Sequence, residues 1–423
     1  MTGAPRHSPI RNASRVRPEA TIQAHPEANW CSQYGVVGST QKLLSQNLPK
    51  SVNISYSRQI FECEKLGLSF MPVASRVVQK VMGYQTLEEC AARTVSIARP
   101  EVMPLAEAIY LQDELDRVTG THDMAVSLED ELGQTVASHL ENIETHAYLI
   151  RDAMVGNNRV STWAGFKDLS MRHARCRPLR VTEELDAAAL CSTWQGNDFF
   201  AHFLIDDAAT YSLAEDFAEP FYSGADMPRS PHCLDYLSRF GSKYVERQHV
   251  RVRDLWLFRD YSLGPDKRRR LQSMAARAKA ATPASEPSPG AFIRRGVTGQ
   301  VRALENAAEI EAWCVAQGFV IVDPEHQSVD EICAALKGVP LVVGVEGSHL
   351  VHALFTMAEG GAIVCIQPAD RFNVIFRHLS AALNLHWGFV VAEGTSEGFH
   401  LELDKLKATL QLVQERIANG GCM

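Results

Sequence analysis

The sequence predicts an α/β protein of two Rossmann-like domains that face each other across a cleft, preceded by a less regular N-terminal region. Three observations predict this. Strand-like runs begin at about residue 145. A Pro/Ala/Ser-rich segment follows at residues 281–290, and after residue 290 strand and helix patterns alternate regularly. A chain of 423 residues is long enough to form two cores.

The clearest unit of the alternation lies between residues 341 and 372. The apolar run 341–345 predicts a buried strand, Glu346-Gly347-Ser348 predicts a tight turn, and a helix is expected to follow and to end at Gly360-Gly361. Residues 362–366 predict the next strand. Such sheets bind ligands at the carboxyl ends of their strands, over helix N-termini. The turn at Glu346 is therefore the strongest candidate ligand site.

The other elements of the C-terminal domain, residues 291–400, follow the same order. Further strands are expected at 291–295, 319–323 and 387–391, and helices at 306–317, 328–338 and 372–383. Ser328 and Glu331 form a capping box at the start of the second of these helices. Five strands with intervening helices predict a Rossmann-like parallel sheet. A C-terminal helix in residues 401–423 is expected to pack back across the domain seam.

The N-terminal domain is expected to span residues 26–280, with its α/β core from about residue 145. A hairpin is expected from the strands 146–150 and 159–163, because Gly156-Asn157-Asn158 between them favours a turn. The remaining expected elements are helices at 87–97, 128–143, 199–214 and 233–240, a strand at 252–258, and a helix from Pro265 to about residue 280. Residues 281–290 are the predicted linker, and residues 1–25 a disordered basic tail.

Composition excludes several classes of protein. A net charge of −8 argues against a general nucleic-acid binder. No run of 18 apolar residues predicts a membrane span, and the N-terminus lacks the apolar region of a secretory signal. The ten cysteines form no C-x-x-C pair, so no zinc site is suggested, and a reducing cytoplasm is the simplest setting. The basic tail is either a plain disordered tail or a contact with an anionic membrane surface.

A resemblance to a known family begins at the turn. The run Val345-Glu346-Gly347-Ser348-His349-Leu350-Val351-His352, followed by Ala353-Leu354-Phe355, is similar to the signature of glycosyltransferase family 61, which usually reads H-G-A-G-L-T-N/H before a Leu-Phe pair. Gly347, Leu350 and His352 match this signature. Glu346 stands where the family usually has His, Ser348 where it has Ala, and His349 where it has Gly.

The resemblance extends to the first strand of the C-terminal domain. Arg294 and Arg295 end this strand as in the family, and Arg302-Ala303-Leu304-Glu305-Asn306 resembles a following R-x-L-N-E segment with Asn and Glu exchanged. The resemblance implies that this region faces the diphosphate of a nucleotide-sugar. Arginine side chains and helix N-termini stabilise the charge that such a leaving group gains. The alternative is that the arginines are solvated charges at a strand end.

The resemblance thus implies a set of donor-binding residues, namely Arg294, Arg295, Arg302, Glu346, Gly347, Ser348, His349 and His352. Each of the polar residues at the turn also has a structural interpretation. Ser348 is a good helix N-cap, Glu346 can be an exposed charge, and His352 can be a half-buried histidine with a satisfied ring.

The candidate catalytic residues lie in the N-terminal domain. Asn197 to Asp206 resembles the second family signature, N-x-x-H-x-x-x-D, in which His202 and Asp206 match in spacing while Asn197 stands five residues before the His. Four residues apart, His202 and Asp206 can share one helix face, and an Asp beside a His can raise its basicity. We expect His202, or Asp206 acting directly, to be the general base. The alternative is that His202 caps the helix and Asp206 or Asp207 is a solvated charge.

Two absent motifs favour a reaction without metal or cofactor. The chain has no Asp-x-Asp, the motif with which metal-dependent sugar transferases hold a divalent ion on the diphosphate. It also has no G-x-G-x-x-G after a strand, which disfavours a nicotinamide or flavin enzyme.

The resemblance therefore implies an inverting, metal-independent glycosyltransferase with the two-domain arrangement called GT-B. The expected partners are a nucleotide-sugar donor and a glycan or other hydroxyl acceptor. The expected setting is surface polysaccharide synthesis of the bacterial capsular type, in the cytoplasm or at the inner face of the membrane. The alternative is a protein of the same fold that binds a nucleotide or a glycan without turnover.

Overall fold

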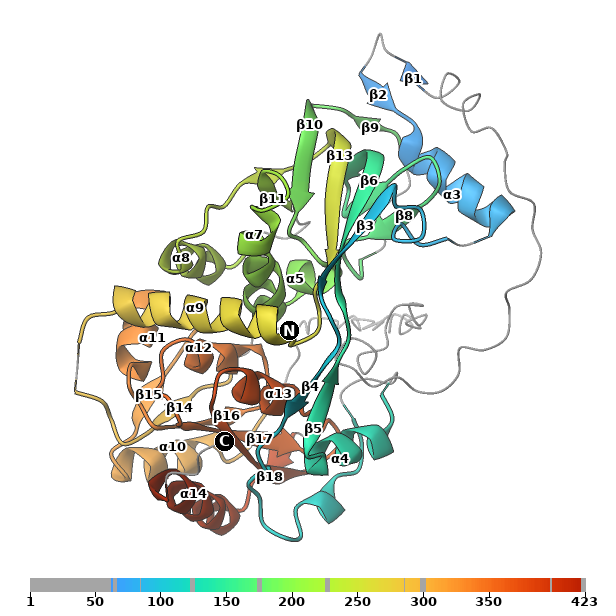
Figure 1. The fold of residues 1–423 in the computed structure, drawn as a ribbon. Helices are drawn as coiled ribbons and strands as arrows, with labels where there is room; N and C mark the ends of the chain where they lie inside the picture. The colour runs from blue at the N-terminus through green and yellow to red at the C-terminus, as the bar shows by residue number, and fades with distance from the viewer. Residues whose placement is uncertain are drawn as a thin grey trace, which may run out of the picture.

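The computed structural model describes residues 62–63, 67–83, 85–121, 126–172, 177–224, 229–284, 286–296, 302–395 and 398–419. The expected tail, residues 1–25, lies outside the described residues. The described chain is a mixed α/β structure in which a mixed sheet and a largely parallel sheet form two units, with helix α9 (Pro265–Ala281) between them (Figure 1).

The first unit is built on an eight-stranded mixed sheet. Its order is β12-β11-β10-β13-β6-β7-β8, with β3 also pairing with β6. Strands β10 to β13 run parallel to one another, while β3, β6, β7 and β8 pair antiparallel. The bounds are β3 Arg93–Ala98, β6 Thr145–Gly156, β7 Arg159–Ser161, β8 Phe166–Asp168, β10 Glu183–Leu190, β11 Pro220–Ser223, β12 Glu246–Arg247 and β13 Val250–Arg259.

The predicted hairpin is confirmed as the β6–β7 pair. Gly156 pairs with Arg159, so Asn157 and Asn158 form a two-residue loop. Both have positive φ angles, 51° and 55°, which is the geometry of a type I′ turn and the reason that asparagine is favoured at both positions.

Helices of the first unit lie near the expected positions, except for α5, which was not expected. They are α5 Trp194–Asp198, α6 Phe200–His202, a π-helical turn η2 Phe203–Asp207, α7 Ala208–Ala214, α8 Pro231–Phe240 and α9. The helix expected at 199–214 is therefore present, but one wider turn interrupts it. Such π-turns are often found at functional sites.

The second unit has a six-stranded sheet in the order β15-β14-β16-β17-β18-β19, in which all neighbours are parallel except β18 and β19. The strands are β14 Ala291–Ile293, β15 Val320–Val322, β16 Leu341–Val345, β17 Ala362–Pro368, β18 His386–Gly394 and β19 Phe399–His400. The helices are α10 Ala307–Ala316, α11 Val329–Leu336, the 3₁₀ turn η3 Ser348–Leu350, α12 Val351–Leu354, α13 Ile375–Ala382 and α14 Leu403–Ala418. All five predicted strands are present, and the Ser328–Glu331 capping box is confirmed.

The order of the five parallel strands explains where a ligand can bind. In chain order it is second, first, third, fourth, fifth, so the direction of winding reverses between β14 and β16. Open sheets of this kind bind ligands at the carboxyl ends of the two strands beside the reversal. The turn after β16, which begins at Glu346, lies at this point.

Three expected helices are wrong in part. The helix expected to end at Gly360-Gly361 consists only of η3 and the four-residue α12, which ends at Leu354. Residues 87–97 do not form a helix, because Arg93–Ala98 is strand β3 on the edge of β6. Thr94, Val95 and Ile97 are β-branched, and β-branched residues favour a strand where a partner strand is available. The expected helix 128–143 ends at Val136 as α4 (Leu128–Val136), and strand β5 (His139–Asn142) then pairs with β4 (Glu101–Pro104).

Residues 105–121 and 126–137, expected in the N-terminal domain, pack on the second sheet. Ile109 donates to the carbonyl of Trp387 and accepts from the amide of Phe389, at 3.0 and 3.1 Å. The Arg377 guanidinium donates to the carbonyls of Ala106 and Ala137. Helix α14 likewise packs mainly on β17 and β18 of its own sheet, whereas it was expected to pack across the domain seam.

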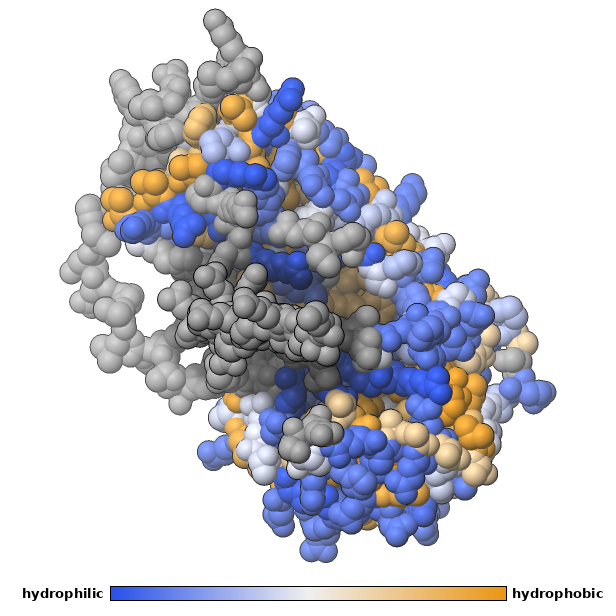
Figure 2. Space-filling model, turned by 180° about the vertical axis from the view of Figure 1, so that it is seen from behind, coloured by the Kyte–Doolittle hydropathy of each residue, from blue (hydrophilic) through white to orange (hydrophobic). Residues whose placement is uncertain are grey.

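The remaining elements are β1 Glu62–Cys63, β2 Leu68–Ser69, β9 Leu179–Arg180, helix α3 Met71–Met82 and the 3₁₀ turn η1 Leu115–Arg117. On the face opposite to Figure 1, apolar side chains gather over α3, where Val77 and Val81 are 57% and 76% exposed (Figure 2). Among the described residues, no helix is both long and apolar enough to cross a bilayer.

Candidate active site

Three arginines gather at the carboxyl ends of the second sheet. Arg295 follows β14, Arg302 lies in the connection to α10, and Arg371 follows β17. Burial lowers the pKa of Arg295 and of Arg371. The positive charge of Arg302 is the second cause and lowers both pKa values further. We call these three residues the arginine cluster. Because like charges are held together here, the cluster favours an anionic ligand.

Glu346 is the buried anion of this cluster. Its carboxylate lies 2.8 Å from Nη1 of Arg302, and the two side chains are only 6% and 8% exposed. The Arg302 guanidinium also donates to the carbonyl oxygen of Glu346. The alternative of an exposed Glu346 is therefore wrong.

Gly347 is required by its geometry. Its φ is +150°, and a Cβ there would lie 2.2 Å from Nη1 of Arg295 and 2.7 Å from Nη1 of Arg302. Two guanidinium groups thus lie directly over this residue, where no side chain fits. Gly347, not Ser348, occupies the N-cap of η3, and no side chain caps this turn.

His349 belongs to the same group of side chains. Its Nδ1 lies 3.2 Å from Nη1 of Arg295, which donates to it. Burial and then the charge of Arg295 hold the pKa of His349 well below its ordinary value, so the ring is neutral at pH 7. His349 therefore adds a hydrogen-bonding group to the site but no charge.

Two other predicted donor-binding residues have partners outside the arginine cluster. Arg294 makes a bidentate ion pair with Glu311 and a further one with Asp323, and these bonds raise its pKa. His352 is fully buried, and burial lowers its pKa to about 3. Its Nδ1 atom lies 2.8 Å from the Tyr236 hydroxyl, within hydrogen-bond distance. The structural interpretation of His352 as a satisfied histidine matches this contact.

The predicted catalytic pair forms a buried relay with a third residue. Nδ1 of His202 lies 2.6 Å from Asp206, and the ammonium of Lys267 donates to the other oxygen of the same carboxylate. Their side chains are 5%, 4% and 1% exposed. Asp206 is thus not a solvated charge, and Phe199, not His202, is the N-cap of α6, so neither structural alternative is observed.

The electrostatics of this relay suit a base. Burial alone would raise the pKa of Asp206, but the charge of Lys267 and the hydrogen bond from His202 outweigh it and lower the pKa. The carboxylate is therefore ionised and accepts a hydrogen bond from Nδ1 of His202, an arrangement in which an Asp fixes the tautomer of a His and raises the basicity of its Nε2 atom.

The neighbouring carboxyl, Asp207, is held differently. It accepts hydrogen bonds from the amide and hydroxyl of Thr193, at 2.9 and 2.8 Å. A Cβ at Gly196 would lie 2.2 Å from its carboxylate, so a glycine is needed there. Burial raises the pKa of Asp207 to about 8, to which the charge of Asp206 adds.

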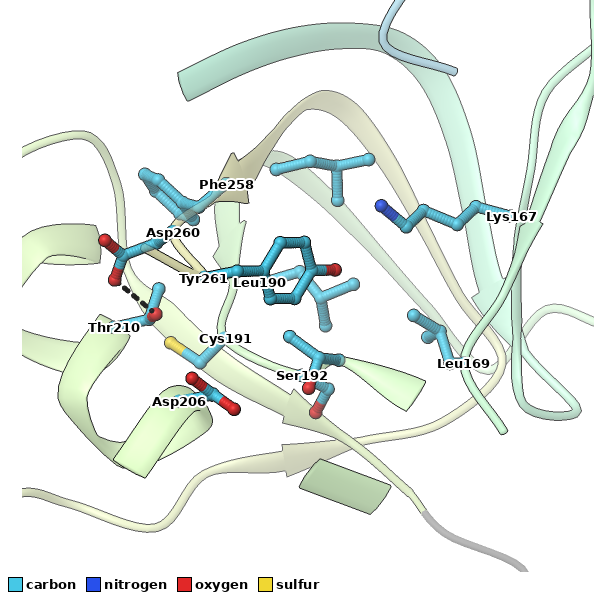
Figure 3. Close-up of a pocket in the computed structure, with 12 residues that line it drawn as sticks. Lys167, Leu169, Leu190, Cys191, Ser192, Asp206, Thr210, Phe258, Asp260 and Tyr261 are labelled. Atoms are coloured by element: carbon cyan, nitrogen blue, oxygen red, sulfur yellow. Dashed lines mark hydrogen bonds between the residues drawn. The ribbon is translucent and has the colours of Figure 1, made fainter. Parts of the chain in front are cut away.

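A small cavity lies beside Asp206 at the carboxyl end of the first sheet. The Tyr261 ring and the Lys167 side chain point into it from opposite sides (Figure 3). Its volume of about 20 Å³ is enough for a water molecule and too small for a sugar.

The two groups of residues meet at the interface between the units. Helix α6, which carries His202, packs against η3, which carries His349. The rings of Phe200 and His352 lie 5.0 Å apart across this contact, and His232 bonds to the carbonyl of Gln327 at 3.0 Å. The fold thus brings together two motifs that are about 150 residues apart in the sequence.

Comparison with known families identifies this arrangement. Residues 200–364 match the family model Glycosyltransferase 61. Over this stretch, the chain is similar to glycosyltransferase family 61. The resemblance stated from the sequence is thereby confirmed, and the match supports a glycosyltransferase. No curated protein matches the chain.

The family match covers α6, the relay residues and the turn after β16, but it ends in β17 before Arg371. Sequence reasoning missed Arg371 and Lys267. Lys267 stands in the run Lys267-Arg268-Arg269-Arg270, which has the composition of a solvated helix face. The buried Asp206 opposite α9 is what draws this one side chain inward, and no local pattern signals it.

Proposed function

We propose that this protein transfers a sugar from a nucleotide-sugar to a hydroxyl group of a glycan or another acceptor, with inversion at the anomeric carbon. The observation that carries the proposal is the packing of α6 against η3. This packing supports the proposal, because α6 carries His202 of the buried His202–Asp206–Lys267 relay and η3 follows Gly347, over which Arg295 and Arg302 lie.

The reaction requires one group to take a proton and another to hold the leaving diphosphate. The acceptor oxygen attacks the anomeric carbon, its proton passes to Nε2 of His202, and the bond from that carbon to the diphosphate oxygen breaks. Asp206 accepts a hydrogen bond from Nδ1 of His202 throughout and stabilises the imidazolium that forms. Arg295, Arg302 and Arg371 stabilise the charge that develops on the diphosphate.

The proposal includes the GT-B arrangement, in which the two units face each other across the reaction site. The reversal of winding at β14 and β16 supports a nucleotide site in the second unit. In the structure the side chain of His202 is only 5% exposed. An acceptor therefore reaches Nε2 only when side chains at the interface move apart.

Metal independence and the biological setting are further parts of the proposal. The absence of Asp-x-Asp from the sequence supports a diphosphate site built on arginine. We propose that no cofactor is needed, and that the protein acts on a glycan acceptor in surface polysaccharide synthesis of the bacterial capsular type. We place this step in the cytoplasm or at the inner face of the membrane.

A panel of nucleotide-sugars with acceptor glycans, followed by mass spectrometry, tests the proposal. We expect release of the nucleoside diphosphate and a glycosylated product with one donor class, and the same rate in excess EDTA. Binding of a nucleotide-sugar without any transfer or hydrolysis would instead support the non-catalytic binding protein. Full loss of activity in EDTA, with recovery on adding manganese, would contradict the metal-free part.

A further inference from the structure

The arginine cluster contains a carboxylate that the binding of a diphosphate does not require. Three guanidinium groups converge here, yet Glu346 lies 2.8 Å from Nη1 of Arg302 and is almost completely buried. A negative charge at this place opposes the binding of every phosphate group. It therefore needs a reason beyond the binding of the donor.

The charges that face the site can be counted. Among the residues that the structure describes, Arg295, Arg302 and Arg371 are cations, Glu346 is a buried anion, and the His349 ring is neutral, which leaves two net positive charges. Two more carboxylates act on the cluster, Glu325 on Arg295 and Asp370 on Arg371, but both residues are exposed, so solvent screens them.

The donor and the product of the proposed reaction differ in charge. Each phosphate in the diphosphate of a nucleotide-sugar is a diester with one negative charge. When the sugar leaves, the terminal phosphate becomes a monoester of about −1.5 to −2 at neutral pH. The nucleoside diphosphate product thus carries almost one charge more than the donor, and a site of high positive charge would hold the product longer than the donor.

We infer that Glu346 sets the charge of the site to match the intact donor, so that the nucleoside diphosphate is released after transfer. This inference rests on the proposed function. Glu346 thus makes the site discriminate between the intact donor and the nucleoside diphosphate product. Its carboxylate repels the added charge of the terminal phosphate, and the buried position makes that repulsion strong because solvent does not screen it.

Isothermal titration of the wild type and the Glu346→Gln variant tests the inference. The probes are UDP, GDP, CDP and ADP, and the intact nucleotide-sugar of the tightest-binding nucleoside, without acceptor. In Glu346→Gln we expect the nucleoside diphosphate to bind roughly tenfold more tightly and the nucleotide-sugar to gain clearly less, about threefold or below. Asp370→Asn is the matched control, because it removes one exposed, solvent-screened negative charge outside the cluster, beside Arg371, and we expect little change.

Two results would overturn the inference. One is unchanged or weaker binding of the nucleoside diphosphate in the folded Glu346→Gln variant, and the other is an equal gain for product and donor. If Glu346→Gln does not fold, as judged by circular dichroism, Glu346→His takes its place, since histidine is the usual family residue at this position, and the same results apply. A wild type that binds none of the nucleotides would instead contradict the proposed function, so the two failures are distinguishable.

Discussion

Gly347 is the residue on which the geometry of the arginine cluster depends most directly. A methyl group at this position would meet the guanidinium groups of Arg295 and Arg302, and the φ of +150° is unfavourable for alanine. We predict that Gly347→Ala weakens nucleoside diphosphate binding about tenfold or more, because backbone strain and displaced side chains cost about 1–3 kcal/mol. Calorimetric titration measures this.

Gly394→Ala, at the end of β18, is the matched control for this prediction. No atom lies within 4 Å of a Cβ at Gly394, and its φ is not positive, so the same methyl group should leave nucleotide affinity unchanged. Equal affinities for the wild type and a folded Gly347→Ala would contradict the placement of the phosphates beside this turn.

Asp207 should make stability depend on pH. The folded protein keeps its proton up to a pKa of about 8, whereas the unfolded chain releases it near 3.8, so the unfolded state binds fewer protons between these values. Stability due to this group is therefore full below about pH 4 and is lost as the pH rises to about 8. The Asp207→Asn variant has no titratable group at this position, so it should lose less stability than the wild type as the pH rises.

Urea unfolding at pH 5 and pH 8.5 measures this difference. We expect the wild type to lose about 2 kcal/mol or more of unfolding free energy relative to Asp207→Asn over this interval. A difference between the two proteins that is the same at both pH values would show that Asp207 does not titrate in this range.

The residues of the site could be predicted only where a local pattern existed. Gly347 and His202 stand in recognisable motifs, and the structure brings both to the interface. Lys267 and Arg371 have no such pattern, because their roles depend on groups that are distant in sequence. Lys267 bonds to Asp206, which lies 61 positions earlier in the sequence. Arg371 comes near Arg302 only because β14 and β17 lie in one sheet.

At the scale of elements, two serines at helix starts make a direct comparison. Ser328 caps α11, accepting from the amide of Glu331, while Gly347 and not Ser348 is the N-cap of η3. We predict that Ser328→Ala lowers the unfolding free energy by about 1 kcal/mol and that Ser348→Ala leaves it nearly unchanged. Chemical denaturation measures both, and an equal loss in the two variants would contradict the assignment of the caps.

The success of element prediction also depended on burial. The strands β14 to β18 were predictable because apolar runs bounded by glycine and polar turns are typical of a sheet covered on both faces. The pattern failed for β3, where apolar spacing also fits a helix and only pairing with β6 decides. Nothing local could show that residues 105–121 and 126–137 pack on the second sheet, because their partners are more than 200 positions away.

At the scale of the whole molecule, the two units are joined as well as separate. A single hydrophobic core includes Phe203 and Tyr236 of the first unit and Leu350 and Phe355 of the second. Helix α9 lies between the units and forms hydrogen bonds with both. Lys267 donates to the carboxylate of Asp206 in the first unit, and Gln272 donates to the carbonyl of Ala382 in the second. The proposed division of labour follows: the first unit supplies the base and the second unit holds the donor.

That division is the central claim, and it is tested by measuring turnover and donor affinity together in variants of each unit. His202→Ala should lose turnover by roughly a hundredfold or more, the usual scale of acid–base catalysis, with donor affinity nearly unchanged. Arg295→Ala and Arg302→Ala should each lose donor affinity by roughly 1.5–3 kcal/mol, the scale of a charge-assisted hydrogen bond. Near-normal turnover in folded His202→Ala, or unchanged donor affinity in both arginine variants, would contradict it.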